Sequence, residues 1–96
     1  LNILGTKYDL LFTSDYATYP ILTDKYGYCD TINKEMIVMS ELEDEFKDRV
    51  VRHEIVHAFL HESGLDDNSW AKTEEIVDWI AIQFPKLKEV FDNITT

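Results

Sequence analysis

The sequence predicts an α+β fold, in which a small antiparallel sheet packs against a long helix that is followed by a second helix. Three observations support this prediction. Short runs of β-branched and aromatic residues, separated by turn-forming residues, occupy the first 40 positions. Apolar residues then recur at helical spacing over residues 41–62 and again over residues 70–84. A chain of 96 residues suffices for one hydrophobic core, so a single domain is expected over residues 1–96.

The first strand is expected within residues 3–12, which carry a run of leucines and aromatic residues. Gly5-Thr6 offers an early turn inside this segment. Residues 14–25 contain Pro20 and are expected to form a loop or an irregular edge segment.

A hairpin is expected next, with strands at residues 26–30 and 35–40 and a turn at residues 31–34. Met36, Val38 and Ser40 alternate along this strand with Ile37 and Met39, so both of its faces could be partly covered. We expect the same five residues to form the edge of the sheet beside a cleft. An extended peptide could add to that edge through main-chain hydrogen bonds.

The first helix is expected to begin near residue 41, because Ser40-x-x-Glu43 matches a capping box. It runs to about residue 62 and ends at Gly64 in a left-handed cap.

The second helix is expected to begin at a cap formed by Asn68 or Ser69. It runs to about residue 84 and stops at Pro85, which has no amide hydrogen to continue the helical hydrogen bonds. A short last helix over residues 86–91 closes the chain.

Within the first helix, residues 53–57 have the pattern H-E-x-x-H. His53 and His57 lie about 40° apart around the axis, so both imidazoles can close on one metal ion, for which zinc is the usual choice. Glu54 points into the same opening and could hold the water that the metal activates. Apolar residues fill nearly all the remaining circumference, which favours a core helix whose one polar stripe lines a cleft. The alternative is a buried helix whose histidines only form hydrogen bonds within the core.

A third protein ligand is expected from the second helix. Glu74 and Asp78 lie four residues apart and flank the apolar face of that helix, whereas Glu75 lies nearer its solvent side. We therefore expect Glu74 to bind the metal and Asp78 to accept the free N–H of a ligand histidine, with Glu75 as the second choice for the ligand. The simpler alternative leaves both glutamates as solvated surface charges. Trp70 and Trp79 are expected to be packing residues.

Two other residues have side chains that bind metals. His61 lies about 12 Å along the axis from His53, too far for both to bind one ion, and is expected at the rim of the cleft. Cys29 is the only cysteine, so no internal disulfide can form, which fits a reducing compartment. A partly buried, inert thiol is the preferred interpretation of Cys29, with metal ligation as the alternative.

The stretch RHEIVHAFLHESGL, followed by WAKTEEIVDWIAIQFPKL, resembles the small zinc metallopeptidases encoded by bacteriophages and prophages. These are grouped with the ImmA/IrrE-type metallo-endopeptidases, in the gluzincin class. The upstream segment GYCDTINKEMIVMS resembles the hairpin of that family, so the resemblance extends over residues 27–90.

The resemblance implies a minimal zincin-like fold in which His53, His57 and Glu74 bind Zn²⁺ and Glu54 is the general base. Gluzincins favour an acid or amide four residues after the metal glutamate, and Asp78 matches that position. The better-known relatives cleave repressor proteins and are much longer than this chain. The expected substrate is therefore a protein or peptide, either a repressor or another regulatory protein.

Amino-acid composition and net charge limit the classes of partner that the chain could bind. A hydrophobic content of 45% with 12% aromatic residues is typical of a globular protein. The net charge of −10 argues against nonspecific nucleic-acid binding, and no apolar run is long enough for a membrane span. The first residues contain no basic segment before an apolar run, so no secretory signal is expected. Because the chain begins at Leu1 and not at a methionine, we expect a few residues to precede it. These features and the single cysteine favour a cytoplasmic location, and the resemblance to phage-encoded peptidases implies that the cell is a bacterial host.

The expected reaction is zinc-assisted peptide hydrolysis, with Glu54 taking a proton from water and passing it to the departing amine. Tyr26, Tyr28 and His61 are candidates for stabilising the oxyanion. Two alternatives are a non-catalytic zinc-binding module that occupies a host or phage protein, and a purely structural zinc protein.

Overall fold

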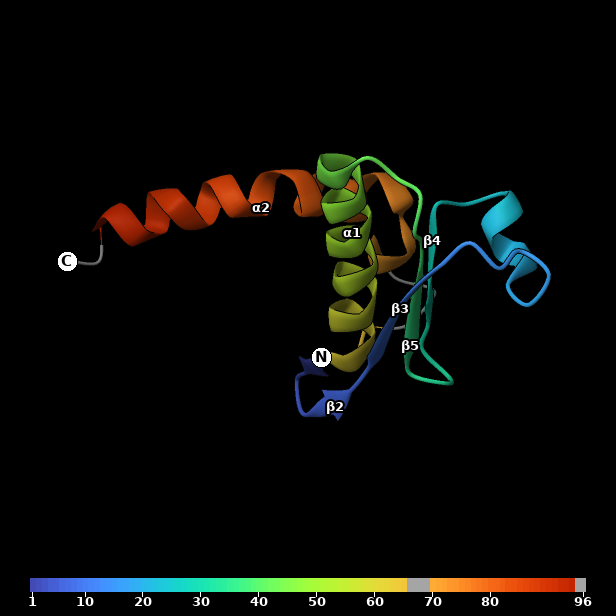
Figure 1. The fold of residues 1–96 in the computed structure, drawn as a ribbon. Coiled ribbons are helices and arrows are strands. Elements are labelled where there is room, and N and C mark those ends of the chain that lie inside the picture. The colour runs from blue at the N-terminus through green and yellow to red at the C-terminus, as the bar shows by residue number, and fades with distance from the viewer. Residues whose placement is uncertain (66–69, 95–96) are drawn as a thin grey trace.

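The computed structural model describes residues 1–65 and 70–94, and these residues form an α+β fold (Figure 1). The elements follow one another in the order β1 (Asn2–Ile3), β2 (Thr6–Lys7), β3 (Asp9–Thr13), the 3-10 helix η1 (Pro20–Thr23), β4 (Gly27–Asp30), β5 (Glu35–Met39), α1 (Asp44–Glu62), the 3-10 helix η2 (Trp70–Lys72) and α2 (Glu74–Ile94). The expected α+β class is thus confirmed. No helix within the described residues is long and apolar enough to cross a membrane.

The three-stranded sheet is mixed, so the prediction of an antiparallel sheet is wrong. Its order is β3-β5-β4, with β3 parallel to β5 and β4 antiparallel to β5. The hairpin of β4 and β5 is confirmed, but β5 is the central strand and not the expected edge. Residues 36–38 of β5 are buried on both faces, as a central strand requires. The edge strand that lies beside α1 is β4.

The segment expected as the first strand forms three short strands, and a tight turn separates the first two. β1 and β2 pair antiparallel, and the turn between them lies at Leu4 and Gly5, one residue earlier than expected. Both turn residues have a positive φ, at 49° and 92°, and only glycine adopts that conformation without strain. The chain then enters β3, which pairs with β5.

Helix α1 begins three residues later than expected, because its N-cap is Glu43 and not Ser40. The Ser40 amide donates to the Thr13 carbonyl at 3.0 Å, so it is not available to the Glu43 carboxylate as the capping box requires. Glu43 is the actual cap, and its carboxylate accepts from the amides of Glu45 and Phe46. At the other end, Gly64 has a φ of 95°, which confirms the left-handed termination.

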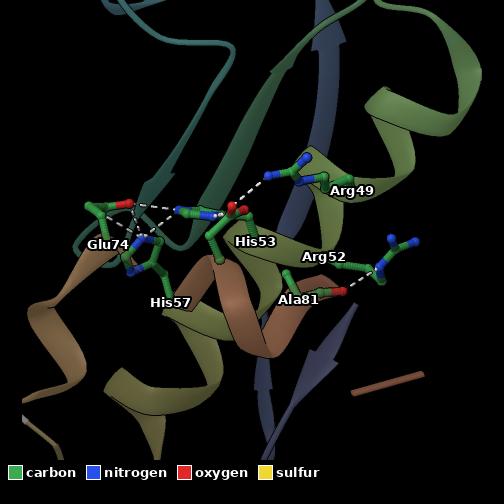
Figure 2. Close-up of polar contacts among 7 residues, drawn as sticks. Arg49, Arg52, His53, His57, Glu74 and Ala81 are labelled. Atoms are coloured by element: carbon green, nitrogen blue, oxygen red, sulfur yellow. Dashed lines mark hydrogen bonds and ion pairs between the residues drawn. The ribbon is translucent and has the colours of Figure 1, made fainter. Parts of the chain in front are cut away.

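Helix α2 begins at Glu74 and continues through Pro85 to Ile94, so the predicted stop at Pro85 is wrong. The predicted caps, Asn68 and Ser69, lie outside the described residues. Because proline has no amide hydrogen, the carbonyl of Ala81 loses its helical partner. Arg52 of α1 donates its Nε to that carbonyl at 2.9 Å, which satisfies it (Figure 2).

Helix α1 is the centre of the fold. The sheet lies on one side of it, and α2 crosses it and then extends past it on the side away from the sheet (Figure 1). Two small clusters of buried side chains contact α1, one containing Ile3, Tyr8, Met36 and Ala58, the other containing Leu60, Ala71 and Val77. Trp70 and Trp79, expected to pack inside, are 51% and 60% exposed. Histidine and acidic side chains of α1 and α2 come together where the two helices cross, beside β4.

Candidate metal centre

A cleft of about 670 Å³ opens at the crossing of the two helices, between α1, the edge strand β4 and the start of α2. All five residues singled out from the sequence, His53, Glu54, His57, Glu74 and Asp78, line it. Four-residue spacing on α1 places the two histidines on one side of that helix, and the first two turns of α2 bring both acids to them.

The nitrogens of two histidines and the carboxylate of Glu74 converge on one point in this cleft (Figure 2). His53 Nε2 lies 2.7 Å from Glu74 Oε2 and 3.1 Å from His57 Nε2. His57 Nε2 lies 3.1 Å from Glu74 Oε1. Within the described residues, this is the group of histidines, cysteines and acids whose ligand atoms lie close enough together to share a metal ion.

The carboxylate of Asp78 determines the tautomer of His53, that is, which ring nitrogen carries the hydrogen and which one presents a lone pair to the cluster. Asp78 Oδ1 lies 3.2 Å from His53 Nδ1, and its other oxygen accepts from Arg49 at 2.6 Å. The hydrogen bonds from Arg49 and His53 lower the pKa of Asp78, against the effect of burial, so it remains an acceptor. Nδ1 of neutral His53 must then carry the hydrogen, which leaves a lone pair on Nε2.

Three electron-pair donors facing one another repel unless a cation lies between them. A proton on one histidine would relieve one contact only, whereas a metal ion would satisfy all three donors. Tetrahedral zinc, with bonds of about 2.0–2.2 Å, separates its ligand atoms by roughly 3.3–3.6 Å. The observed separations of 2.7–3.1 Å are a few tenths of an ångström shorter, so small movements of side chains would admit the ion. The donor set could therefore hold a metal ion with bonds of this length.

The charges of the three candidate ligands also suit a cation. Burial lowers the pKa of His57, which keeps its imidazole neutral and able to donate an electron pair. Burial alone would raise the pKa of Glu74, but the two histidines outweigh it and lower that pKa. The side chains of His53 and His57 are about one-fifth exposed and that of Glu74 is two-thirds exposed, so the cluster opens to solvent on the Glu74 side.

Glu54 is almost completely buried, with 6% of its surface exposed, directly beside the cluster. Burial raises the pKa of its carboxyl to about 7, with a further contribution from the charge of Glu74, while His53 and Lys25 act in the opposite direction. A carboxyl group that titrates near neutral pH can accept a proton and return it, which is what a general base requires.

Two residues that support the site were not expected from the sequence. Gly27, in β4, has no side chain, and a Cβ there would lie 2.7 Å from Val50 Cγ1 and 3.2 Å from Glu54 Oε2. Glycine thus allows the edge strand to approach the Glu54 carboxylate, and a glycine between two tyrosines in a strand was a signal of such an approach. Arg49 binds Asp78, and its position four residues before His53 could have shown that both share one side of α1.

The remaining candidates lie outside the cluster. Glu75 is exposed and does not belong to it. His61 is exposed and lines the cleft, as expected for a residue at its rim. Burial raises the pKa of the half-buried Cys29 thiol to about 12, which is the behaviour of an inert thiol and not of a metal ligand. Tyr26 and Tyr28 both line the cleft.

Comparisons of the chain with protein-family models, with curated proteins and with solved structures found no match. The resemblance to phage-encoded metallopeptidases therefore stays a prediction, which rests on the H-E-x-x-H motif and the downstream Glu74 and Asp78.

Proposed function

We propose that this protein is a zinc-dependent peptidase that hydrolyses a peptide bond in a protein substrate. The observation that carries the proposal is the convergence of His53, His57 and Glu74 on one point, with the buried carboxyl of Glu54 beside them. Three protein ligands leave a fourth position for water or substrate, which is typical of catalytic zinc sites, whereas structural sites use four protein ligands.

In this proposal each residue of the site has one task. His53, His57 and Glu74 hold Zn²⁺, which when bound would polarise the substrate carbonyl and acidify a water molecule. Glu54 would accept a proton from a water molecule in the cleft and return it to the amine that leaves. Asp78 keeps His53 in the tautomer and orientation that ligation needs, and Arg49 holds Asp78 in place.

The edge strand β4 supports a protein substrate over a small molecule. It pairs with β5 on one side only, and residues 27–30 line the cleft. An extended peptide could add to its open side through main-chain hydrogen bonds, with its side chains in the cleft. A repressor or another regulatory protein in the cytoplasm of a bacterial host remains the substrate that the family resemblance favours.

Metal content tests the ligand set directly. We expect one zinc ion per chain in the purified protein and in Glu75→Ala, but loss of the ion or at least tenfold weaker binding in Glu74→Ala. Glu75 is the matched control, because it is the neighbouring glutamate on the same helix and lies outside the cluster. Elemental analysis after dialysis against limiting zinc measures this. Equal zinc content in the two variants would rule out Glu74 as a ligand.

Activity is tested with Glu54→Gln, which keeps the shape of the side chain but cannot accept a proton. Digestion of a pooled peptide library, followed by mass spectrometry, should show cleavage by the zinc-loaded protein and a loss of at least about 100-fold in the variant. The variant should still bind zinc. Stoichiometric zinc without cleavage by either protein would contradict the peptidase proposal and favour the non-catalytic binding module.

A further inference from the structure

Of the described residues that line the cleft, three have basic side chains: Lys25, Arg49 and Lys72. Arg49 is committed to Asp78, with which it forms an ion pair at 2.6 Å. Lys25 forms no ion pair and no side-chain hydrogen bond with any of the described residues. A lysine ammonium has three donors and no acceptor, so an unpaired lysine that lines a cleft can bind an anion there.

The backbone of Lys25 is fixed close to the metal cluster. Its amide donates to the Ile21 carbonyl at 3.1 Å, and the next carbonyl, that of Tyr26, accepts from β5 at 2.9 Å. Gly27 follows two residues after Lys25, at most about 7 Å away along the chain. A Cβ on Gly27 would lie 3.2 Å from Glu54 Oε2. The side chain of Lys25 therefore starts beside the part of β4 that contacts the Glu54 carboxylate.

The charge of Lys25 acts on two side chains that flank the open side of the cluster. Burial has the largest effect on the pKa of Glu54, which it raises, and on the pKa of His57, which it lowers. The positive charge of Lys25 acts to lower both pKa values, so its ammonium lies near both side chains. Lys72 lines the same cleft without acting on Glu54.

The side chains expected from the sequence to stabilise an oxyanion are placed less favourably than Lys25. Tyr26 packs edge-on against Phe46, with ring centroids 4.9 Å apart, and Phe46 lies about 10 Å along α1 before the cluster. Tyr28 directly follows Gly27 in β4, so its side chain lies on the opposite face of the strand from the Cβ position that faces α1. His61 lies at the exposed rim, one turn of α1 beyond the cluster.

We propose that Lys25 binds the negatively charged oxygen that forms from the substrate carbonyl during hydrolysis, an inference that rests on the proposed peptidase function. When the oxygen of water bonds to the carbonyl carbon, one electron pair of the C=O bond moves to the carbonyl oxygen and Glu54 accepts a proton of the water. The Lys25 ammonium donates a hydrogen bond to that oxygen and keeps its own proton. The electron pair returns to the C=O bond as the C–N bond breaks, and Glu54 gives its proton to the leaving amine.

Anion binding tests this role without any peptide. The cobalt-substituted full chain is titrated with acetate at constant ionic strength, and the visible absorption of the metal reports binding at its open position. Acetate has two equivalent oxygens, so one can contact the metal while the other accepts from Lys25. We expect Lys25→Met to weaken acetate binding at least about tenfold, the effect of losing a hydrogen bond between charged groups, and Lys25→Arg to restore most of it.

Lys72→Met is the matched control, because it makes the same substitution at the other lysine that lines the cleft, and it should leave acetate binding unchanged. Lys25 is exposed, so its variants should keep the fold, which circular dichroism checks. Equal acetate affinities of Lys25→Met and Lys72→Met would overturn the proposal. A loss of affinity that is as large in Lys25→Arg as in Lys25→Met would also overturn it, because the charge would then not be responsible.

The kinetics of cleavage separate stabilisation of the oxyanion from binding of the substrate. On a peptide recovered from the library digest, Lys25→Met should lower kcat about 100–1,000-fold with little change in KM, because the charge on the oxygen exists only during the reaction. An unchanged kcat would overturn the proposal. Acetate binding that depends on Lys25 in a protein that cuts no peptide would contradict the peptidase function and leave Lys25 as an anion-binding residue of the metal centre.

Discussion

Asp78 lies between two positively polarised groups, and its position explains how a single carboxylate can orient the proposed metal centre. One of its oxygens is 3.2 Å from His53 Nδ1, and the other is 2.6 Å from Arg49. Because both oxygens have a partner, the carboxylate cannot rotate without losing one. The histidine that it orients is thereby kept with its Nε2 directed at Glu74 and His57.

Replacing Asp78 by Asn should therefore weaken zinc binding without removing a ligand. We expect a loss of about 10–100-fold in affinity, because an amide holds the His53 tautomer less firmly and pairs poorly with Arg49. Competition with a chromogenic chelator measures the affinity. Glu89→Gln, which neutralises an exposed acid on the same helix outside the cleft, should bind zinc as the unaltered protein does. Equal affinities in the two variants would contradict the role of Asp78.

Glu54 makes the metal-free fold depend on pH in a direction that can be worked out. Its pKa is about 7 in the folded protein and near 4.5 when unfolded, so the folded state holds the proton more tightly. Stability from this group is thus fully present below pH 4.5 and declines as pH rises through 7. Removing the charge by Glu54→Gln should raise the free energy of unfolding by about 1–3 kcal/mol at pH 8 and by much less at pH 5.

Urea unfolding of the metal-free protein and of metal-free Glu54→Gln, at both pH values, measures this difference. Other groups titrate in both proteins, so the effect of Glu54 is the change with pH in the difference between their free energies of unfolding. If the free energies of unfolding of the two proteins differ by the same amount at pH 5 and at pH 8, burial does not raise the pKa of Glu54.

At the scale of elements, α2 depends on α1 for a hydrogen bond that its own sequence cannot make. Pro85 leaves the Ala81 carbonyl without a helical donor, and Arg52 supplies one from the neighbouring helix. We expect Arg52→Met to destabilise the protein by about 1–3 kcal/mol, the cost of an unsatisfied buried carbonyl. The loss should be smaller in a Pro85→Ala background, where residue 85 has its own amide hydrogen.

A double-mutant cycle of Arg52→Met and Pro85→Ala, measured by chemical unfolding, tests this coupling. An interaction energy of about 0.5–2 kcal/mol is expected. Additive effects of the two substitutions would mean that the Arg52 contact contributes nothing to the continuity of α2.

The sequence predicted correctly the features that depend on local contacts. It failed for features that depend on contacts between residues far apart in the chain. The pattern H-E-x-x-H places His53, Glu54 and His57 through helical spacing alone, so local periodicity was sufficient for them. The predicted end of α2 was wrong because the helix continues past Pro85 with the help of a hydrogen-bond donor on another helix. That donor is Arg52, which lies 29 residues before Ala81, the residue whose carbonyl accepts the bond. The capping box at Ser40 was wrong for a similar reason, since its amide is committed to β3.

Strand order was the other failure, and its cause is again distant pairing. Alternation within residues 36–40 showed that both faces of β5 could be covered, but not that β3 would lie on one side of it and β4 on the other. Gly27 and Arg49 were missed because each matters only through a residue on a different element or turn, Glu54 in one case and Asp78 in the other.

For the whole molecule, Glu62 joins three separate segments at the end of α1 farthest from the Glu43 cap. Its carboxylate accepts hydrogen bonds from Thr6, Tyr8 and Lys34, at 2.8–2.9 Å. These bonds lower its pKa to about 2, with Lys34 the largest contributor. The stability from Glu62 is therefore present above about pH 4.5 and is lost as pH falls from there towards 2.

Glu62→Gln should accordingly lower the melting temperature at pH 6, with a difference from the unaltered protein that shrinks progressively below pH 4.5. Thermal unfolding followed by circular dichroism between pH 6 and pH 2 measures this. Glu41→Gln, at an exposed acid near the start of α1, should not change the melting temperature in that way. If Glu62→Gln lowers the melting temperature as much at pH 2 as at pH 6, the charge of Glu62 does not hold the three segments together.

The place of α1 between two small clusters of buried side chains has a consequence for how the protein opens. Ala58 belongs to one cluster and Leu60 to the other, so unfolding of α1 would disrupt both clusters. Amide hydrogens of α1 should then exchange with solvent only through global unfolding, whereas those of α2 beyond Pro85 exchange through local fraying. The helix that carries His53, Glu54 and His57 is thus the last part of the molecule to lose its structure, so the survival of the candidate metal centre depends on how long the first turn of α2, with Glu74, stays packed on it.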